Sequence, residues 1–178
     1  PESLGDYEHA LAWFETEFRI LLALTTQAAH SGFTCHAWQL AWTLDTFLDR
    51  RGHWHEWADS QRTGLAAARR AGDEHGQSLA HHGLAKAVAS LGDHDEASTH
   101  LRRALDLYAK LNERSGQARA HMDLSRLYHL QDRHQDALHH AQRALDLADD
   151  TDQPAFYRAT ALNGIGWYNA QLGNFTQA

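Results

Sequence analysis

Histidine is the residue type in this chain with the widest scope for metal binding and acid–base chemistry, and the 178-residue sequence contains 15 of them. Several lie at short spacings: His53 and His55, His81–His82, His129 and His134, and His139–His140. Such spacings have little specificity for a metal when no cysteine or H-E-x-x-H motif accompanies them. We therefore predict neither a metal site nor a bound cofactor.

The single cysteine, Cys35, is the other candidate for chemistry. It lies at the start of a predicted helix, where a thiolate could be favoured, but it also fits as a small packing residue. Nucleophilic catalysis needs a base within reach of the nucleophile and a third group to orient the base, and no such grouping stands out. A lone cysteine excludes an internal disulfide and is typical of a reducing compartment. We predict a cytoplasmic protein that is not an enzyme.

The composition predicts helices throughout the chain. Its only prolines are Pro1 and Pro154, and it has no runs of Val, Ile and Thr that would favour a sheet. The longest apolar stretch, residues 20–29, is shorter than the roughly 20 residues that a membrane span needs. The net charge is −7 and the acidic residues are scattered, so no concentrated basic face is available for nucleic acid. We expect an all-α chain with no membrane or nucleic-acid partner.

An internal repeat organises these predicted helices. The pentapeptide Arg-Ala-Leu-Asp-Leu occurs at 103–107 and again at 143–147, forty residues apart. The same shift aligns Leu44, Leu84 and Leu124, and a shift of forty-one extends the pattern to Ile165. A fixed period of this kind is typical of repeat architectures. The predicted repeats are 36–75, 76–115, 116–156 and a truncated fourth, 157–178, whose first helix is predicted over 157–172.

Each repeat has the sequence pattern of two helices. In residues 79–92 the apolar side chains follow the i, i+3, i+4, i+7 spacing of an amphipathic helix. Asp93 and Glu96 then form a predicted capping box that starts the second helix. Gly72 and Asn112 align at the end of that helix, and both residue types tolerate the left-handed C-cap conformation. Asn174 and Gln177 repeat the capping box, which predicts a further helix from Phe175.

Small residues recur where the two helices of a pair would cross. They are Ala85, Ala97 and Ala104 in the second repeat, and Ser125, Ala137 and Ala144 in the third repeat. This pattern resembles the tetratricopeptide repeat over residues 36–178, although the period of forty exceeds the usual 34 or so. The resemblance implies helical hairpins stacked as a right-handed superhelix. The first repeat departs from the pattern, because Asp45, Trp57 and Gly64 occupy its small positions.

Residues 7–33 lie outside the repeat and predict one long helix that ends at Gly32. They contain a spaced pattern of seven residues: Ala10, Trp13, Glu17, Leu21, Leu24, Ala28 and Gly32. The pattern resembles a segment of AfsR-like regulators of actinobacteria (SARP-type transcription factors and related STAND ATPases), in which such a helix joins a nucleotide-binding region to tetratricopeptide repeats. The resemblance implies a leader helix, residues 1–33, joined to an upstream domain. The sequence has no G-x-x-x-x-G-K-[ST] loop, so ATP and DNA binding are not expected of this chain.

The tetratricopeptide resemblance also implies a concave groove lined by the first helix of each unit. The corresponding residues are Gln39, Trp42 and Thr46, then His82 and Lys86, then Arg119, Met122, Arg126 and His129, and finally Asn163 and Trp167. Basic groups between tryptophans suit a peptide with acidic and apolar side chains. The alternative is that the tryptophans pack between units and the arginines pair with nearby acids.

Two functions follow from this reading. The first is a non-catalytic interaction module of a transcriptional regulator, which binds a protein or peptide, or the regulator's own ATPase core. The alternative is a ligand- or peptide-sensing domain that holds a small signal in its groove. We also expect self-association through residues 157–178, where the apolar face of Leu162, Ile165, Tyr168 and Leu172 is only partly covered.

Overall fold

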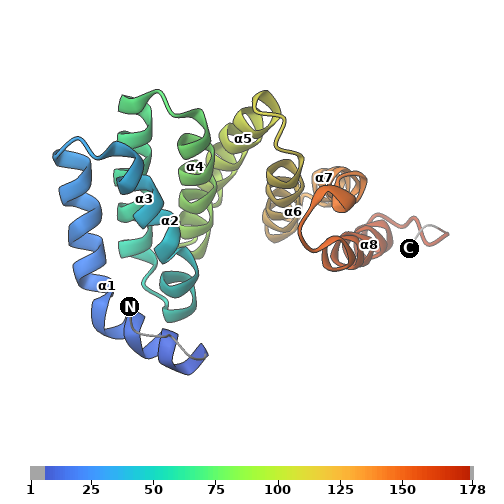
Figure 1. Cartoon of the computed structure of the whole chain (residues 1–178). Helices are drawn as coiled ribbons and strands as arrows, with labels where there is room; N and C mark the ends of the chain where they lie inside the picture. Colours follow the sequence, from blue (N-terminus) through green and yellow to red (C-terminus); the bar gives the residue numbers. More distant parts are fainter. Residues whose placement is uncertain (1–6, 177–178) are drawn as a thin grey trace. The chain divides into compact units, whose positions relative to one another are not determined.

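The computed structural model describes residues 7–176 of the chain. These residues form the following helices: α1 Tyr7–His30, α2 Thr34–Arg51, α3 Trp54–Ala71, α4 Glu74–Ser90, α5 His94–Lys110, α6 Arg114–Leu130, α7 His134–Asp146 and α8 Pro154–Gln171, with one 3-10 turn, η1 Ala148–Asp150 (Figure 1). No strand occurs in residues 7–176. The predicted all-α, tetratricopeptide-like hairpin fold is confirmed. Across the same residues, no helix has the length and apolar character needed to cross a bilayer.

The ends of the helices follow the predicted capping chemistry. Gly72 and Asn112 both adopt left-handed conformations, with φ of 64° and 57°. The Asp93 carboxylate accepts a hydrogen bond from the Glu96 backbone N–H at 2.9 Å, which satisfies a free donor of the first turn of α5. The predicted helix from Phe175 is not formed in residues 175–176, and Gln177 of the second capping box lies outside the described residues.

The chain divides into two compact units, residues 1–91 and 92–178. In the first unit α2 packs on α3, α3 packs on α4, and α1 lies against both α2 and α3 (Figure 1). Burial of one face of each helix forms the core, in which Leu44, Trp57 and Leu84 are almost completely inaccessible to solvent. Removal of this apolar surface from water is the main stabilising contribution.

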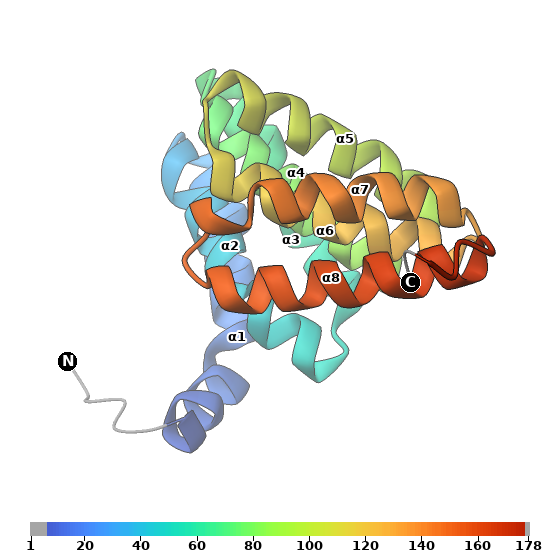
Figure 2. The ribbon, with the colours of Figure 1, turned by 90° about the vertical axis from the view of Figure 1, so that its right-hand side faces the viewer.

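The second unit contains α5, α6, α7, η1 and α8. Helix α6 packs on both α5 and α7, and α7 also packs along α8 (Figure 2). The predicted crossing residues Ser125, Ala137 and Ala144 are all buried, so α6 and α7 approach closely through small side chains. The division between the two units falls after Leu91, inside the predicted repeat 76–115.

Two boundaries differ from the sequence prediction. Helix α8 begins at Pro154 rather than at residue 157, because proline fits the first helical position, where its missing N–H is not needed. The pairs of helices in the first three repeats are predicted to extend through residue 150. Instead α7 ends at Asp146, and the chain passes through η1 before α8.

Candidate functional site

The predicted groove residues of the first unit lie on α2 and α4. Gln39 and Trp42 are exposed on α2, and Trp42 shows 51% of its surface to solvent. His82 is buried on α4, and Lys86 is half-buried. The two α4 residues are therefore less available to a partner than the sequence pattern suggests.

The half-buried carboxyl group of Asp45 explains the environment of Lys86. Asp45 accepts hydrogen bonds at its Oδ1 atom from Trp57 Nε1 at 2.5 Å and from Gln61 Nε2 at 2.6 Å. The Lys86 ammonium lies over the Trp57 ring, 5.2 Å from its centroid, which is within cation–π range. Burial raises the pKa of Asp45 to about 6, against the opposing effects of the Trp57 hydrogen bond and the positive charge of Lys86. These side chains link α2, α3 and α4 and form what we call the Asp45 cluster: Asp45, Trp57, Gln61 and Lys86.

The Asp45 cluster explains why the first repeat departs from the small-residue pattern. Trp57 is completely buried at a position where the other repeats have alanine. The missing side chain of Gly64 allows α3 to approach α2, because a Cβ there would lie 3.1 Å from Trp38 Cα and 3.2 Å from Ala41 Cβ. One large and one absent side chain thus replace two small ones.

The predicted groove residues of the second unit lie on α6 and α8. Arg126 exposes 65% of its side chain and lies 3.8 Å from Asp123, a separation that contributes little to stability at a surface. Trp167 exposes 54% of its surface, and Asn163 on the same helix is also exposed. Met122, which lies between Arg119 and Arg126 in the sequence of α6, is half-buried. This face offers a cation and an aromatic ring to a partner.

Arg119 is the most unusual residue of this face. Its Nε atom is buried and has no hydrogen-bond partner among the described residues. Its guanidinium lies within electrostatic range of the Tyr157 hydroxyl, whose pKa is raised mainly by burial, with Arg119 acting in the opposite direction. Because this atom is covered by the protein itself, it offers no surface to a ligand, and the other atoms of the guanidinium would have to make any contact with a partner.

Several histidines of the second unit lie close to one another. His121 Nδ1 and His140 Nδ1 lie 2.8 Å apart, so one ring donates a hydrogen bond to the other. Burial lowers the pKa of both imidazoles to about 4, and the nearby charge of Arg143 lowers that of His121 further. The sequence did not single out His121. His129, the last predicted groove residue of α6, is half-buried and packs against His134 and Tyr168. Nowhere in residues 7–176 do three or more His, Cys, Asp or Glu side chains gather as metal ligands would.

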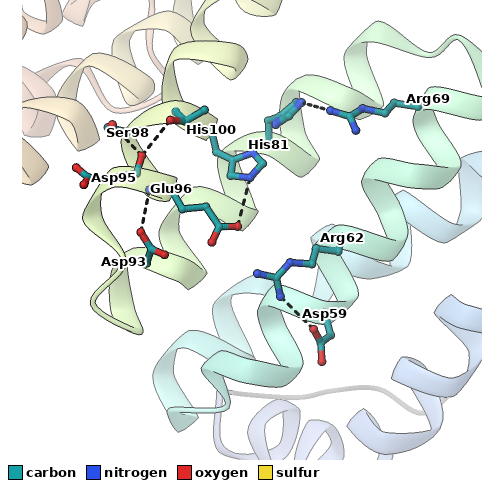
Figure 3. Close-up of polar contacts among 10 residues, drawn as sticks. Asp59, Arg62, Arg69, His81, Asp93, Asp95, Glu96, Ser98 and His100 are labelled. Atoms are coloured by element: carbon teal, nitrogen blue, oxygen red, sulfur yellow. Dashed lines mark hydrogen bonds and ion pairs between the residues drawn. The ribbon is translucent and has the colours of Figure 1, made fainter.

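Further polar contacts lie within and between the helices, and Figure 3 shows several of them. In the first unit Arg69 Nη2 lies 3.3 Å from His81 Nε2, which links α3 to α4. In the second unit the His100 imidazole lies 3.6 Å from the Glu96 carboxylate, one helical turn away. Cys35 is exposed at the start of α2. None of these contacts has the nucleophile–base–orienting-group arrangement that covalent catalysis uses.

The predicted apolar face near the C-terminal end is only partly open. Leu162 and Leu172 expose 52% and 36% of their surfaces, whereas Tyr168 is buried and its hydroxyl accepts a hydrogen bond from Ser125 at 3.2 Å. Ile165 is intermediate. Helix α6 therefore covers the Tyr168 side of α8, and the open surface is the one that carries Leu162.

Antiparallel helix pairs joined by short turns define the class of the molecule as a helical-hairpin repeat protein. Residues 76–150 match the model of the tetratricopeptide repeat family. No protein of curated function matches the chain in sequence.

Solved structures resemble the fold at low sequence identity. The crystal structure of BtubC (BKLC) from P. vanneervenii matches with a TM-score of 0.79 and 18% identity, covering 96% of this chain and 73% of that one. The apo form of RapI matches with a TM-score of 0.53 and 14% identity, covering 88% of this chain and 50% of that one. The chain thus spans half the length of RapI. At these identities the similarities show the fold alone, and neither name supports the AfsR-like assignment.

Proposed function

We propose that this chain is a non-catalytic module that binds a protein or peptide partner on the exposed faces of α6 and α8. The tetratricopeptide match over residues 76–150 suggests a protein–protein interaction module, and such helical repeats are typically non-catalytic. The observation that carries the proposal is that the His129 ring of α6 lies 6.4 Å from the exposed Trp167 of α8, with the exposed Arg126 one turn before His129 on α6.

The chemistry of this face favours an acidic peptide with an aromatic or aliphatic side chain. Arg119 and Arg126 are two turns apart on α6 and present guanidinium groups that carboxylates can bind. Trp167 and the half-buried Met122 offer apolar surface beside them. Asn163 adds an amide that can bond to a peptide backbone. In the first unit Gln39 and Trp42 offer an amide and an aromatic ring on α2 as a surface of their own, whereas His82 and Lys86 contribute less because His82 is buried and Lys86 belongs to the Asp45 cluster.

The test is fluorescence polarisation with labelled acidic peptides that each carry one aromatic residue, with lysine-containing peptides of the same length as the negative set. We expect the acidic peptides to bind and Arg126→Glu to weaken binding at least tenfold without loss of helicity. The control is Arg103→Glu, the same charge change on an exposed residue of α5. Equal binding of acidic and basic peptides, or an equal effect of both substitutions, would contradict the proposal.

The wider context rests on the leader-helix resemblance. We propose that the chain is a cytoplasmic part of an AfsR-like regulator, with residues 1–33 leading from an upstream domain and residues 34–178 forming the repeats. The partner would then include the regulator's own ATPase core. Co-purification of this chain with a separately expressed ATPase core tests this, and retention by the Arg126→Glu variant would place that contact elsewhere.

Self-association through residues 157–178 is a separate proposal, supported by the exposed Leu162, Leu172 and Phe175. Light scattering at rising concentration should show a dimer that Leu162→Glu abolishes. A monomer at every concentration would contradict it. Sensing of a small signal is the alternative function, and one cavity of the first unit favours it.

A further inference from the structure

An apolar pocket lies between α1 and α2 of the first unit and shares no residue with the proposed partner-binding face of α6 and α8. Its volume is about 130 Å³. Leu11 and Phe14 of α1 and Phe47 of α2 supply its apolar wall, and Phe47 is buried. The exposed Thr43, Thr46 and Arg50 also line it, so they lie towards its mouth. The sequence pattern had placed Thr46 in the groove.

The pocket exists because the packing between α1 and α2 is incomplete at one layer. Phe14 stacks on Phe47 with ring centroids 5.5 Å apart, and Phe18 packs on the same ring at 5.4 Å. One turn earlier on α1 the corresponding residue is Ala10, whose methyl group is too short to continue this aromatic layer. The first turns of α1 also bend away from the axis of the rest of the helix (Figures 1 and 2).

The size and lining of the pocket identify the class of ligand. A cavity of about 150 Å³ lined by Leu, Ile and Phe side chains stays dry and holds one benzene molecule. This pocket has a similar volume but opens to solvent beside Thr43, Thr46 and Arg50, and the Thr43 hydroxyl already donates to the Gln39 carbonyl at 2.8 Å. Because Thr46 and Arg50 also lie at the mouth, the inner wall is apolar and offers little that would orient a polar group. We propose that the pocket binds a small free ligand through a single aromatic ring or a branched aliphatic group of the same size.

Binding would change the attachment of the leader helix. The first half of α1 is held to the rest of the unit by Phe14 and Phe18 against Phe47 and by the Glu15–Arg51 ion pair at 2.5 Å. A ligand ring in the pocket contacts Ala10 and Leu11 on one side and α2 on the other, so it extends this contact by one turn. Occupancy should slow hydrogen exchange at the amides of residues 10–15. This inference goes beyond the proposed partner-binding face and stands without it.

The experiment uses benzene as the probe and indole as a ligand with two fused rings, each titrated into the chain and followed by amide chemical shifts. We expect saturable shifts confined to the pocket residues with benzene, and at least tenfold weaker binding of indole. Ala10→Leu should fill the space and weaken benzene binding at least tenfold. Ala12→Leu, the same change at an exposed position of α1, should alter it less than twofold.

Circular dichroism establishes whether each variant folds. If Ala10→Leu does not, Thr46→Leu narrows the pocket from the α2 side and must cause the same loss. Non-saturable shifts, shifts spread over other helices, or equal effects of Ala10→Leu and Ala12→Leu would overturn the proposal. So would binding of a phenylalanine-containing peptide in the pocket when benzene does not bind, because the occupant would then be a partner's side chain.

Discussion

The two units achieve the same close crossing of helices with different chemistry. In the second unit the crossing residues are Ser125, Ala137 and Ala144, which are buried and carry no charge. In the first unit the equivalent positions are Asp45, Trp57 and Gly64. Small side chains stabilise a crossing by van der Waals contact and do not respond to pH. The Asp45 cluster instead depends on directional hydrogen bonds and a titratable group, so the first unit should be the more sensitive to single substitutions.

The largest test of this difference is Trp57→Ala. Removal of a fully buried indole should destabilise the first unit by about 3–5 kcal/mol, through lost burial and the cavity left behind. Trp54→Ala, on the same helix but 39% exposed, should cost well under half as much. Denaturant-dependent hydrogen exchange measures both units separately. Equal losses for the two variants would show that the Asp45 cluster does not hold the first unit.

The second-largest expected effect is a change in the stability of the first unit with pH. Because the folded pKa of Asp45 is about 6 and its ordinary value is 3.8, the folded state binds the proton more tightly, and stability is lost as pH rises from about 4 to 6. The difference of about two pKa values corresponds to roughly 3 kcal/mol. Asp45→Asn keeps an acceptor oxygen for Trp57 and Gln61 and should remove this pH dependence. A first unit whose stability is flat between pH 4 and 6 would contradict the assignment.

The second unit should respond to pH with the opposite sign. The folded pKa values of His121 and His140 are about 4, below the ordinary 6.5, so stability is present above pH 6.5 and lost as pH falls towards 4. Partial solvent screening limits the loss to roughly 1–2 kcal/mol per imidazole. Hydrogen exchange of α6 and α7 between pH 7 and 4 measures it. Replacing both residues, as in His121→Phe with His140→Gln, should abolish the response, whereas His139→Gln, at an exposed neighbour, should retain most of it.

The smallest expected effect is that of Lys86→Met. Loss of the contact with the Trp57 ring should cost about 0.5–1 kcal/mol. Because the Lys86 charge lowers the pKa of Asp45, its removal should also raise that pKa further. Carboxyl-carbon NMR titration of Asp45 gives the second readout, with Arg62→Met on α3 as the control. An unchanged Asp45 pKa in the Lys86→Met variant would show that the Lys86 charge does not act on the Asp45 carboxyl group.

The sequence predicted most of the fold because the responsible signals are local. Periodic apolar residues fixed the helices, and Gly72, Asn112 and Asp93 predicted helix ends that depend on a few neighbouring backbone atoms. The start of α8 was missed because the capping pattern was aligned from the other repeats, whereas Pro154 sets its own position. Local chemistry prevailed over the repeat register at that point.

The candidate site was less predictable because its contacts join distant residues. Trp57 was recognised as out of place, but its partner Asp45 lies on another helix, and only side-chain geometry brings the two together. The same holds for His121 and His140, which are nineteen positions apart. The exposure of Arg126 was expected from the groove positions that the tetratricopeptide resemblance implies, whereas the half-burial of Lys86 depended on the ring beneath it.

The Asp45 cluster also bears on how this array can evolve or be engineered. Gln61, which donates to Asp45, packs so closely on α4 that a Cβ at Gly83 would lie 2.8 Å from its amide carbon. Gly83 and Lys86 belong to the predicted repeat after the one that contains Asp45 and Trp57. The first repeat therefore cannot be duplicated, deleted or exchanged as an independent cassette, as repeats of a consensus array can. Substitutions at these positions should be strongly epistatic, and an alanine-type crossing could arise here only if several of them changed together.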